Sequence, residues 1–205
     1  MHRQGYDLQL TQYDDRGWRA TFYTTGMPKR FELLKQAVPT ARRIGMLDDG
    51  APRFRLVLSE AQHVARTLDV QLVTVDARRG RYKEAFAKMK AQRVDAVYGG
   101  SSPIHAHAQD RKQLIELAAR HRLPAIWEWR LHAEGGGLLS YGASLAVLEN
   151  RVASYVDRLI KGANPAELPV EQPTAVELVI NLKTAKALGL TIPQTLLLRA
   201  DEVIE

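Results

Sequence analysis

A Gly-Gly-Ser-Ser-Pro run at residues 99–103 is the first segment of this sequence with the chemistry of a small-molecule site. It follows a short apolar segment with strand character, residues 95–98, and leads into a helical pattern. Ligands of open α/β sheets lie at the carboxyl ends of the strands. There, the hydroxyls of Ser101 and Ser102, together with backbone N–H groups, are suited to hold a carboxylate or another anion. The same residues also fit a turn in which serine caps a helix, and the run matches no phosphate-loop consensus.

Two aspartates, Asp48 and Asp49, close the apolar segment 43–47. A carboxylate at the end of a strand can accept a hydrogen bond from a ligand ammonium group, which makes Asp48 a candidate ligand-binding residue. An aspartate in this place also resembles the phospho-acceptor of a receiver domain. A turn and helix cap before Pro52 is the simpler structural interpretation.

Three aromatic residues extend the list of candidates. Trp127 and Trp129 are two residues apart and flank Glu128, so both tryptophans can face one side of an extended segment. Tyr141 follows a glycine-rich stretch at 135–137. Aromatic rings and a tyrosine hydroxyl suit a flat or polar ligand, and we expect Trp127 and Tyr141 to bind ligand. Packing in the core or at a hinge is the alternative for both.

The sequence argues against several other kinds of site. There is no cysteine, which excludes thiolate catalysis and cysteine-bound metal. His105 and His107 are two residues apart and would not share a helix face, so no metal site is expected. No base accompanies Ser101 or Ser102 in a nucleophile-elbow pattern. We therefore expect no enzyme activity and no cofactor.

The charge and hydropathy of the sequence also indicate which kinds of partner and location to expect for the chain. The net charge is +6, from 29 Lys and Arg against 23 Asp and Glu, and the charges are scattered along helices rather than gathered in blocks. This pattern indicates a solvated surface and not a nucleic-acid interface. No segment approaches the roughly 18 apolar residues of a membrane helix. The polar stretch 1–15 lacks the apolar core of a signal peptide, which predicts a cytoplasmic location for the chain as it stands.

Strand and helix patterns alternate through the first two thirds of the chain. Apolar runs predict strands at 43–47, 70–75, 95–98 and 125–127, and helical spacing predicts helices at 31–37, 54–68, 82–92 and 109–120. Further elements are expected at 138–141 (strand), 145–161 (helix), 177–181 (strand) and 182–188 (helix), with a short strand at 19–23. This order predicts an α/β fold with a parallel sheet and helices on both faces.

The C-terminal half carries segments specific enough to indicate a family. They are GGGLLSYG (135–142), YVDRLIKGANPAELPVEQP (155–173) and ELVINLKTAKALGLTIPQTLLLRADEVIE (177–205). Together with ELLKQAVPTARRIGML (32–47), DAVYGGSSP (95–103) and ELAARHRLPAI (116–126), they resemble the ABC-transporter substrate-binding proteins related to the tryptophan and tyrosine binders. The resemblance covers about residues 29–205.

The resemblance implies a type I periplasmic-binding-protein fold, in which two α/β lobes joined by three hinge crossings close over a ligand. It divides the chain into an irregular segment 1–28, a second-lobe domain 29–127, a return into the first lobe at 128–173 and a final return at 174–205. The first lobe is then largely missing, so the chain is expected to be an N-terminally truncated member. The apolar face of the helix at 145–161 should consequently be exposed, or covered by residues 1–28 or by a second copy of the chain.

The resemblance also implies function. The chain is expected to bind a small molecule, amino-acid-like in character, and to serve membrane subunits of an ABC transporter. Family members are periplasmic or membrane-anchored. A metabolite-sensing or phospho-acceptor regulatory domain is the alternative function.

Overall fold

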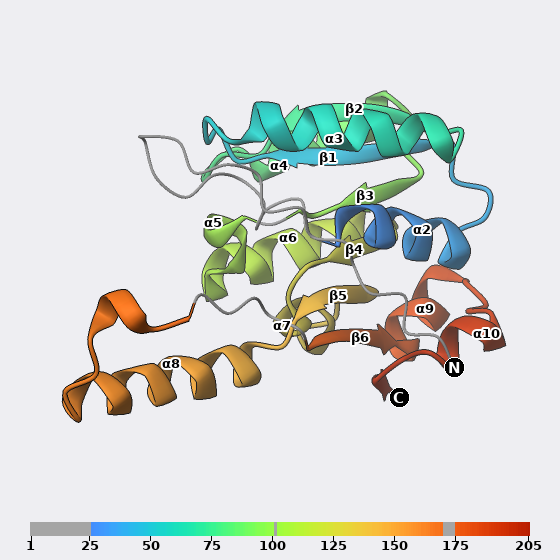
Figure 1. The fold of residues 1–205 in the computed structure, drawn as a ribbon. Coiled ribbons are helices and arrows are strands. Elements are labelled where there is room, and N and C mark those ends of the chain that lie inside the picture. The colour runs from blue at the N-terminus through green and yellow to red at the C-terminus, as the bar shows by residue number, and fades with distance from the viewer. Residues whose placement is uncertain (1–25, 101, 170–174) are drawn as a thin grey trace.

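The strands of this chain form where short apolar runs end in turn residues. The structure is a computed structural model that describes residues 26–100, 102–169 and 175–205. Within these ranges the chain builds a seven-stranded sheet in the order β2-β1-β3-β4-β5-β6-β7 (Figure 1). The strands are β1 (Arg43–Asp48), β2 (Gln71–Asp76), β3 (Ala96–Tyr98), β4 (Ala125–Trp127), β5 (Leu139–Ala143), β6 (Val176–Asn181) and β7 (Glu202–Ile204). The strand expected at 19–23 lies outside the described residues.

The sheet is mostly parallel, as the alternation of strands and helices predicts. Strands β1 to β5 pair in parallel, with Ile44 opposite Leu72 on β2 and Ala96 on β3. The structure adds one antiparallel pair, β5 with β6, in which Leu139 lies opposite Ile180. The order changes direction at β1, because the chain passes from β1 outward to β2 and from β3 the other way to β4.

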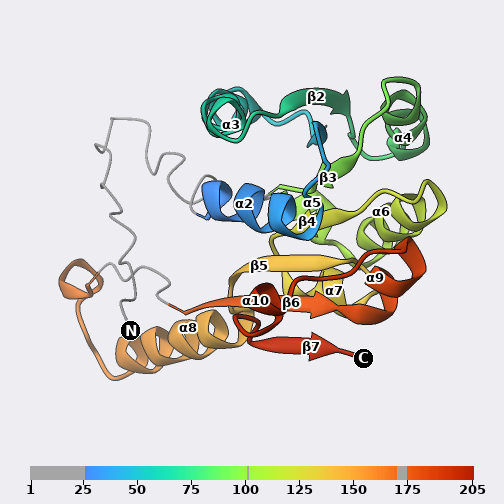
Figure 2. The same ribbon diagram turned by 90° about the vertical axis from the view of Figure 1, so that its right-hand side faces the viewer.

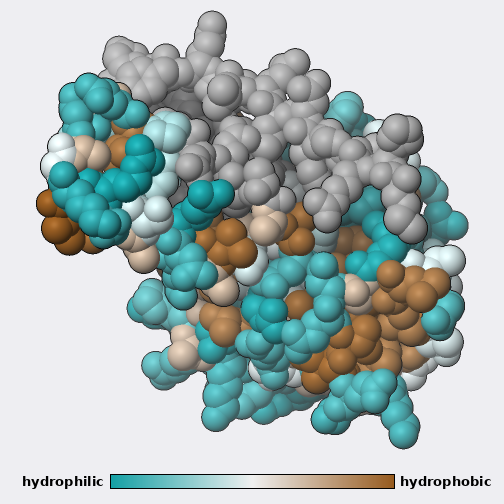
Figure 3. All heavy atoms as spheres, turned by 60° about the horizontal axis from the view of Figure 1, so that its bottom comes forward, coloured by the Kyte–Doolittle hydropathy of each residue, from teal (hydrophilic) through white to brown (hydrophobic). Residues whose placement is uncertain are grey.

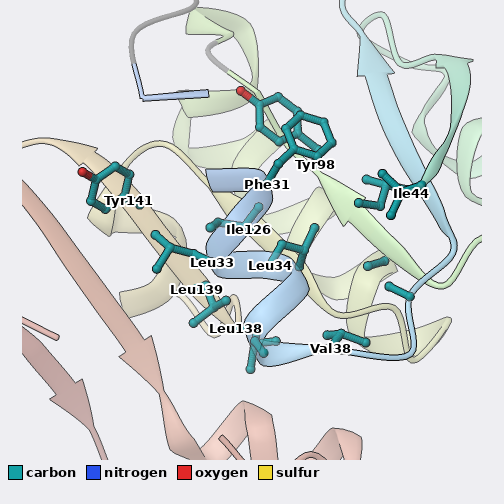
Figure 4. Packing of buried hydrophobic residues seen from close by; sticks show 14 of the residues in the cluster. Phe31, Leu33, Leu34, Val38, Ile44, Tyr98, Ile126, Leu138, Leu139 and Tyr141 are labelled. Carbon is teal, nitrogen blue, oxygen red and sulfur yellow. The ribbon is translucent and has the colours of Figure 1, made fainter. Parts of the chain in front are cut away.

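Helices cover both faces of the sheet and create two cores (Figure 2). The larger core packs α2 and α3 against one face, and Figure 4 shows Phe31 and Leu34 of α2 among side chains of the sheet. The other core lies under α4 and α6 and contains Trp127. The helices are α2 (Met27–Ala37), α3 (Phe54–Thr67), α4 (Tyr82–Ala91), α5 (Pro103–Ala106), α6 (Ala108–Arg120), α7 (Arg130–Glu134), α8 (Leu145–Ile160), α9 (Leu182–Leu188) and α10 (Gln194–Leu197), with a 3-10 turn η1 (Pro165–Glu167).

Most sequence-predicted elements are confirmed with small changes at their ends. Helix α2 begins four residues earlier than expected, at Met27. Five short elements were not predicted: α5, α7, η1, α10 and β7. A segment of three to five residues shows too little periodicity, and these five lack the apolar runs that predicted the short strands β3, β4 and β5.

The chain leaves the sheet after Ala143 and returns at Val176. Figures 1 and 2 show α8 projecting away from the strands, and none of its residues is buried. Because β5 belongs to the same sheet as β1–β4, the sequence-based boundary at 127/128 does not coincide with this departure. We therefore propose that one lobe contains residues 26–143 and 176–205, and that 144–175 form the excursion.

Candidate functional site

The loops after β1 and β3 meet at the point where the strand order reverses. In open α/β sheets, ligands bind outside the carboxyl ends of the strands at such a point. A cavity of about 20 Å³ lies there, between the ends of β1 and β3 and the start of α3. It is lined by Met46, Leu47, Asp49, Arg53, Phe54, Val57, Tyr98, Gly99, Gly100 and Ser102. That volume holds about one water molecule.

Asp49 is the buried charged group of this cavity, with 4% of its side chain exposed. Its carboxylate accepts a hydrogen bond of 2.7 Å from the Ser102 hydroxyl and one of 3.1 Å from the Ala51 N–H. It also pairs with the guanidinium of Arg53, four residues further along the chain. Burial acts to raise the pKa of Asp49, but the hydrogen bonds and the nearby guanidinium outweigh burial and lower it. The cavity wall therefore carries an ionised carboxylate.

Tyr98 forms the apolar part of the same wall from β3. Its side chain is 1% exposed, and its ring stacks on Phe31 at a centroid distance of 4.6 Å (Figure 4). Phe54 and Val57 of α3 add apolar surface to the cavity. The site thus combines a charged pair, Asp49 with Arg53, and an aromatic and aliphatic floor.

Arg30 is a fully buried cation that the sequence analysis missed. Its Nε donates to the Tyr98 hydroxyl at 3.2 Å, and its NH1 donates to the Tyr141 carbonyl at 3.0 Å. The same NH1 lies 3.8 Å from Glu128 Oε1. Burial acts to lower the pKa of Arg30, and these neighbours outweigh it and raise the pKa. The signal was available, because Arg30 shares a helix face with Met27 and Leu34, both fully buried.

Of the predicted site residues Ser101, Ser102 and Asp48, the structure places only Ser102 in the wall of the cavity. Ser101 lies outside the described residues. Ser102 is buried, caps α5 by accepting from the His105 N–H at 3.4 Å, and lines the cavity through its bond to Asp49. Asp48 is half-buried and accepts from the Gly50 N–H at 2.8 Å, in the turn that the simpler interpretation favoured. It does not line the cavity, whereas its neighbour Asp49 does.

Trp127 and Tyr141 do not line the cavity either. Trp127 is 1% exposed and lies in the core on the other face, with its ring stacked on His132 at 4.6 Å. Its ring abuts Gly99 of the cavity wall, where an added Cβ would lie 2.1 Å from the Trp127 Cε3, so Trp127 supports the wall from behind. Tyr141 is 8% exposed on β5, and Figure 4 shows it well separated from Tyr98. A ligand confined to this cavity would contact neither side chain.

His132 is a buried histidine that stacks on Trp127 behind this wall. Its Nε2 lies 3.2 Å from the His105 carbonyl and its Nδ1 3.2 Å from the Trp129 carbonyl. Burial lowers the pKa of His132 to about 4, and burial also lowers that of His105. Both rings are therefore neutral at pH 7. In the part of the chain that the structure describes, no group of three or more acidic or histidine side chains is arranged to hold a metal ion.

Comparisons with known proteins agree with this fold. A family model described as ABC transporter substrate binding protein matches residues 24–204. A conserved domain protein from Vibrio cholerae is 24% identical with a TM-score of 0.74, and the match covers 86% of this chain and 59% of that one. An ABC domain in complex with L-Trp from Streptococcus pneumoniae is 24% identical with a TM-score of 0.76, covering 86% and 61%.

A third structure, a ligand-free, open substrate binding protein with adhesive properties from Clostridium difficile, is 17% identical with a TM-score of 0.60 and covers 86% and 59%. This chain thus spans about three fifths of the length of these proteins. No curated protein sequence matches it. Among its described helices, none combines the length and apolar character needed to cross a bilayer. The fold and the match over nearly the whole chain show that it belongs to the ABC transporter substrate-binding protein family.

Proposed function

We propose that this chain forms one lobe of the solute-binding component of an ABC transporter, and that the cavity between β1 and β3 is its part of the ligand site. The observation that carries this proposal is the ionised, buried Asp49 at the point where the strand order reverses. A carboxylate held by Ser102, Ala51 and Arg53 is preorganised and costs little further ordering when a ligand arrives. The first lobe would supply the opposing wall.

The ligand class we propose is an amino acid or a similar zwitterion. Asp49 offers an acceptor for an ammonium group, and Arg53 beside it offers donors for a carboxylate. Phe54 and Tyr98 provide a floor for an apolar or aromatic side chain. The L-Trp complex of the Streptococcus pneumoniae domain makes L-Trp a suitable first probe. The role we propose is binding without chemistry, because the matching family model describes substrate-binding proteins.

The partners that follow from this role are the membrane subunits of a transporter, which would recognise the closed form of two lobes, in the periplasm or anchored at the membrane. Closure would bring the first lobe, which we expect α8 to join, against the cavity. A second copy of the chain is the other partner we propose for α8. Nucleic acid is not a proposed partner.

The test is a titration of the ¹⁵N-labelled chain with L-Trp, L-Leu and L-Glu, followed by NMR. We expect saturable shifts of the amides of Gly99, Gly100 and Ser102 with at least one of these amino acids. Asp49→Asn should reduce the affinity roughly tenfold or more, because the ammonium loses its charged acceptor. Asp48→Asn is the matched control, since it changes the adjacent aspartate outside the cavity and should leave the shifts unaltered.

Two outcomes would refute the proposal. One is shifts that spread over the surface without saturating at these amides. The other is equal loss of binding in the Asp48 and Asp49 variants, because only Asp49 lines the cavity.

A further inference from the structure

A charged side chain in the core is expensive unless its partners compensate for lost hydration, so the contacts of Arg30 are strongly constrained. Arg30 is 0% exposed, and its guanidinium has contacts with three neighbouring strands or their ends. It donates to the hydroxyl of Tyr98 at the end of β3 and to the carbonyl of Tyr141 on β5. It lies 3.8 Å from Glu128, the residue that follows β4. One cation therefore joins the carboxyl ends of β3 and β4 to the middle of β5.

Two of these contacts lie next to the place where the chain leaves the sheet. Gly142 follows Tyr141, and an added Cβ there would lie 2.3 Å from the carbonyl oxygen of Glu128, so the backbones of the two strand ends touch. Two residues later, the Ser144 N–H donates to the carbonyl of Ala175 at 3.1 Å. That hydrogen bond joins the outgoing and returning segments, which we call the crossing (Gly142–Ser144 with Ala175).

The third contact lies in the candidate site. Tyr98 lines the cavity, and its hydroxyl accepts from Arg30 Nε. We propose that Arg30 is a positioning residue that couples the cavity wall at Tyr98 to the crossing, so that movement of Tyr98 alters the stability of the Ser144–Ala175 hydrogen bond. The inference rests on the proposed function, since solute occupancy is what would move Tyr98. The coupling itself is a property of the unliganded chain.

Amide hydrogen exchange of Ser144 tests the coupling in the full chain without any ligand. Tyr98→Phe removes the hydroxyl that Arg30 engages and keeps the ring that stacks on Phe31. Loss of a hydrogen bond to a charged group should raise the exchange rate of the Ser144 amide about tenfold. Arg30→Lys keeps the charge and loses the forked donors, and should raise the rate of the same amide.

Tyr82→Phe is the matched control. Tyr82 is as buried as Tyr98, and its hydroxyl also lies in a hydrogen bond, 2.9 Å from Asp110, but in the core on the other face. Removal of the Tyr82 hydroxyl should raise the exchange rate of the Ser144 amide by no more than it raises the rates of the other amides in the sheet. Equal Ser144 rates in wild type and Tyr98→Phe would overturn the proposal, as would an equal rise in Tyr82→Phe.

The proposed solute site and the proposed coupling through Arg30 can each be refuted without refuting the other. If amino acids shift the cavity amides but Tyr98→Phe leaves Ser144 exchange unchanged, Arg30 is structural only and the solute site stands. If Ser144 exchange responds as expected but no amino acid produces shifts, the coupling stands and the proposed ligand class is wrong.

Discussion

Asp48 and Asp49 show how adjacent identical residues acquire different roles. Successive side chains near the end of a strand point in different directions. Asp48 remains half-buried and closes the turn at Gly50, whereas Asp49 turns toward Ser102 and Arg53. The candidate binding group is the one whose carboxylate is buried and kept ionised by its partners.

His132 should make the stability of the chain depend on pH. Its folded-state pKa is about 4, against 6.5 for an unperturbed histidine, because burial disfavours the charged ring. The unfolded chain therefore binds more protons between these values, so the stability is complete above pH 6.5 and falls as the pH drops toward 4. The shift predicts a loss of about 3 kcal/mol in the free energy of unfolding across that window.

Urea denaturation from pH 7 to pH 4 measures this slope. His132→Gln should make the slope shallower, and the part that remains should include the contribution of His105, whose pKa is also lowered by burial. His63→Gln removes an exposed histidine and serves as the control. A slope that is the same in wild type and His132→Gln would contradict the assignment.

At the scale of elements, α8 differs from every other long helix described in the chain. Val152, Val156 and Ile160 lie on one face of it and are 63%, 48% and 80% exposed. The expected face also includes Leu159, which is 40% exposed, so the described residues of the lobe leave this face largely uncovered. In the space-filling view toward this side, hydrophobic surface is interspersed with hydrophilic surface (Figure 3). An apolar helix face in water favours association with another surface.

Replacing Val152 and Val156 together by Lys should leave the lobe stable. At low protein concentration, the free energy of unfolding should change by less than about 0.5 kcal/mol, because neither side chain is buried. Leu139→Ala in β5 is the control, and should cost about 2–5 kcal/mol because Leu139 is fully buried.

Sedimentation velocity of the wild type should reveal a dimer that the Val152→Lys, Val156→Lys double variant loses. A monomeric wild type at high concentration would rule out self-association through α8.

At the scale of the whole molecule, one lobe leaves much of a bound solute in water. A two-walled site with a Kd of about 1 μM corresponds to roughly −8 kcal/mol, and losing half of its contacts leaves roughly −4 kcal/mol, or about 1 mM. We therefore expect this 205-residue chain, tested by itself, to bind L-Trp or branched amino acids no better than about 1 mM. Isothermal titration calorimetry measures this affinity. Micromolar binding would mean that the single lobe provides the whole site.

Local sequence determined the elements of this protein. Strand and helix periods depend on neighbouring residues, so the α/β order, the parallel strands β1–β4 and the helical cap at Ser102 were all predictable. The C-terminal segments 135–142, 155–173 and 177–205 are distinctive enough by themselves to indicate the family. The same patterns place Asp49 and Ser102 at strand ends, where ligands bind.

Only the tertiary structure decided which of these residues meet. Arg30 bonds to Tyr98 and Tyr141, which are 68 and 111 residues away, and no local pattern encodes contacts at such separations. Alternation along β4 shows that Ile126 and Trp127 face opposite sides, but not which side holds the cavity. Which face holds the cavity depends on the helices that cover each face. The tertiary structure places Trp127 in the core and Tyr98 in the wall of the site.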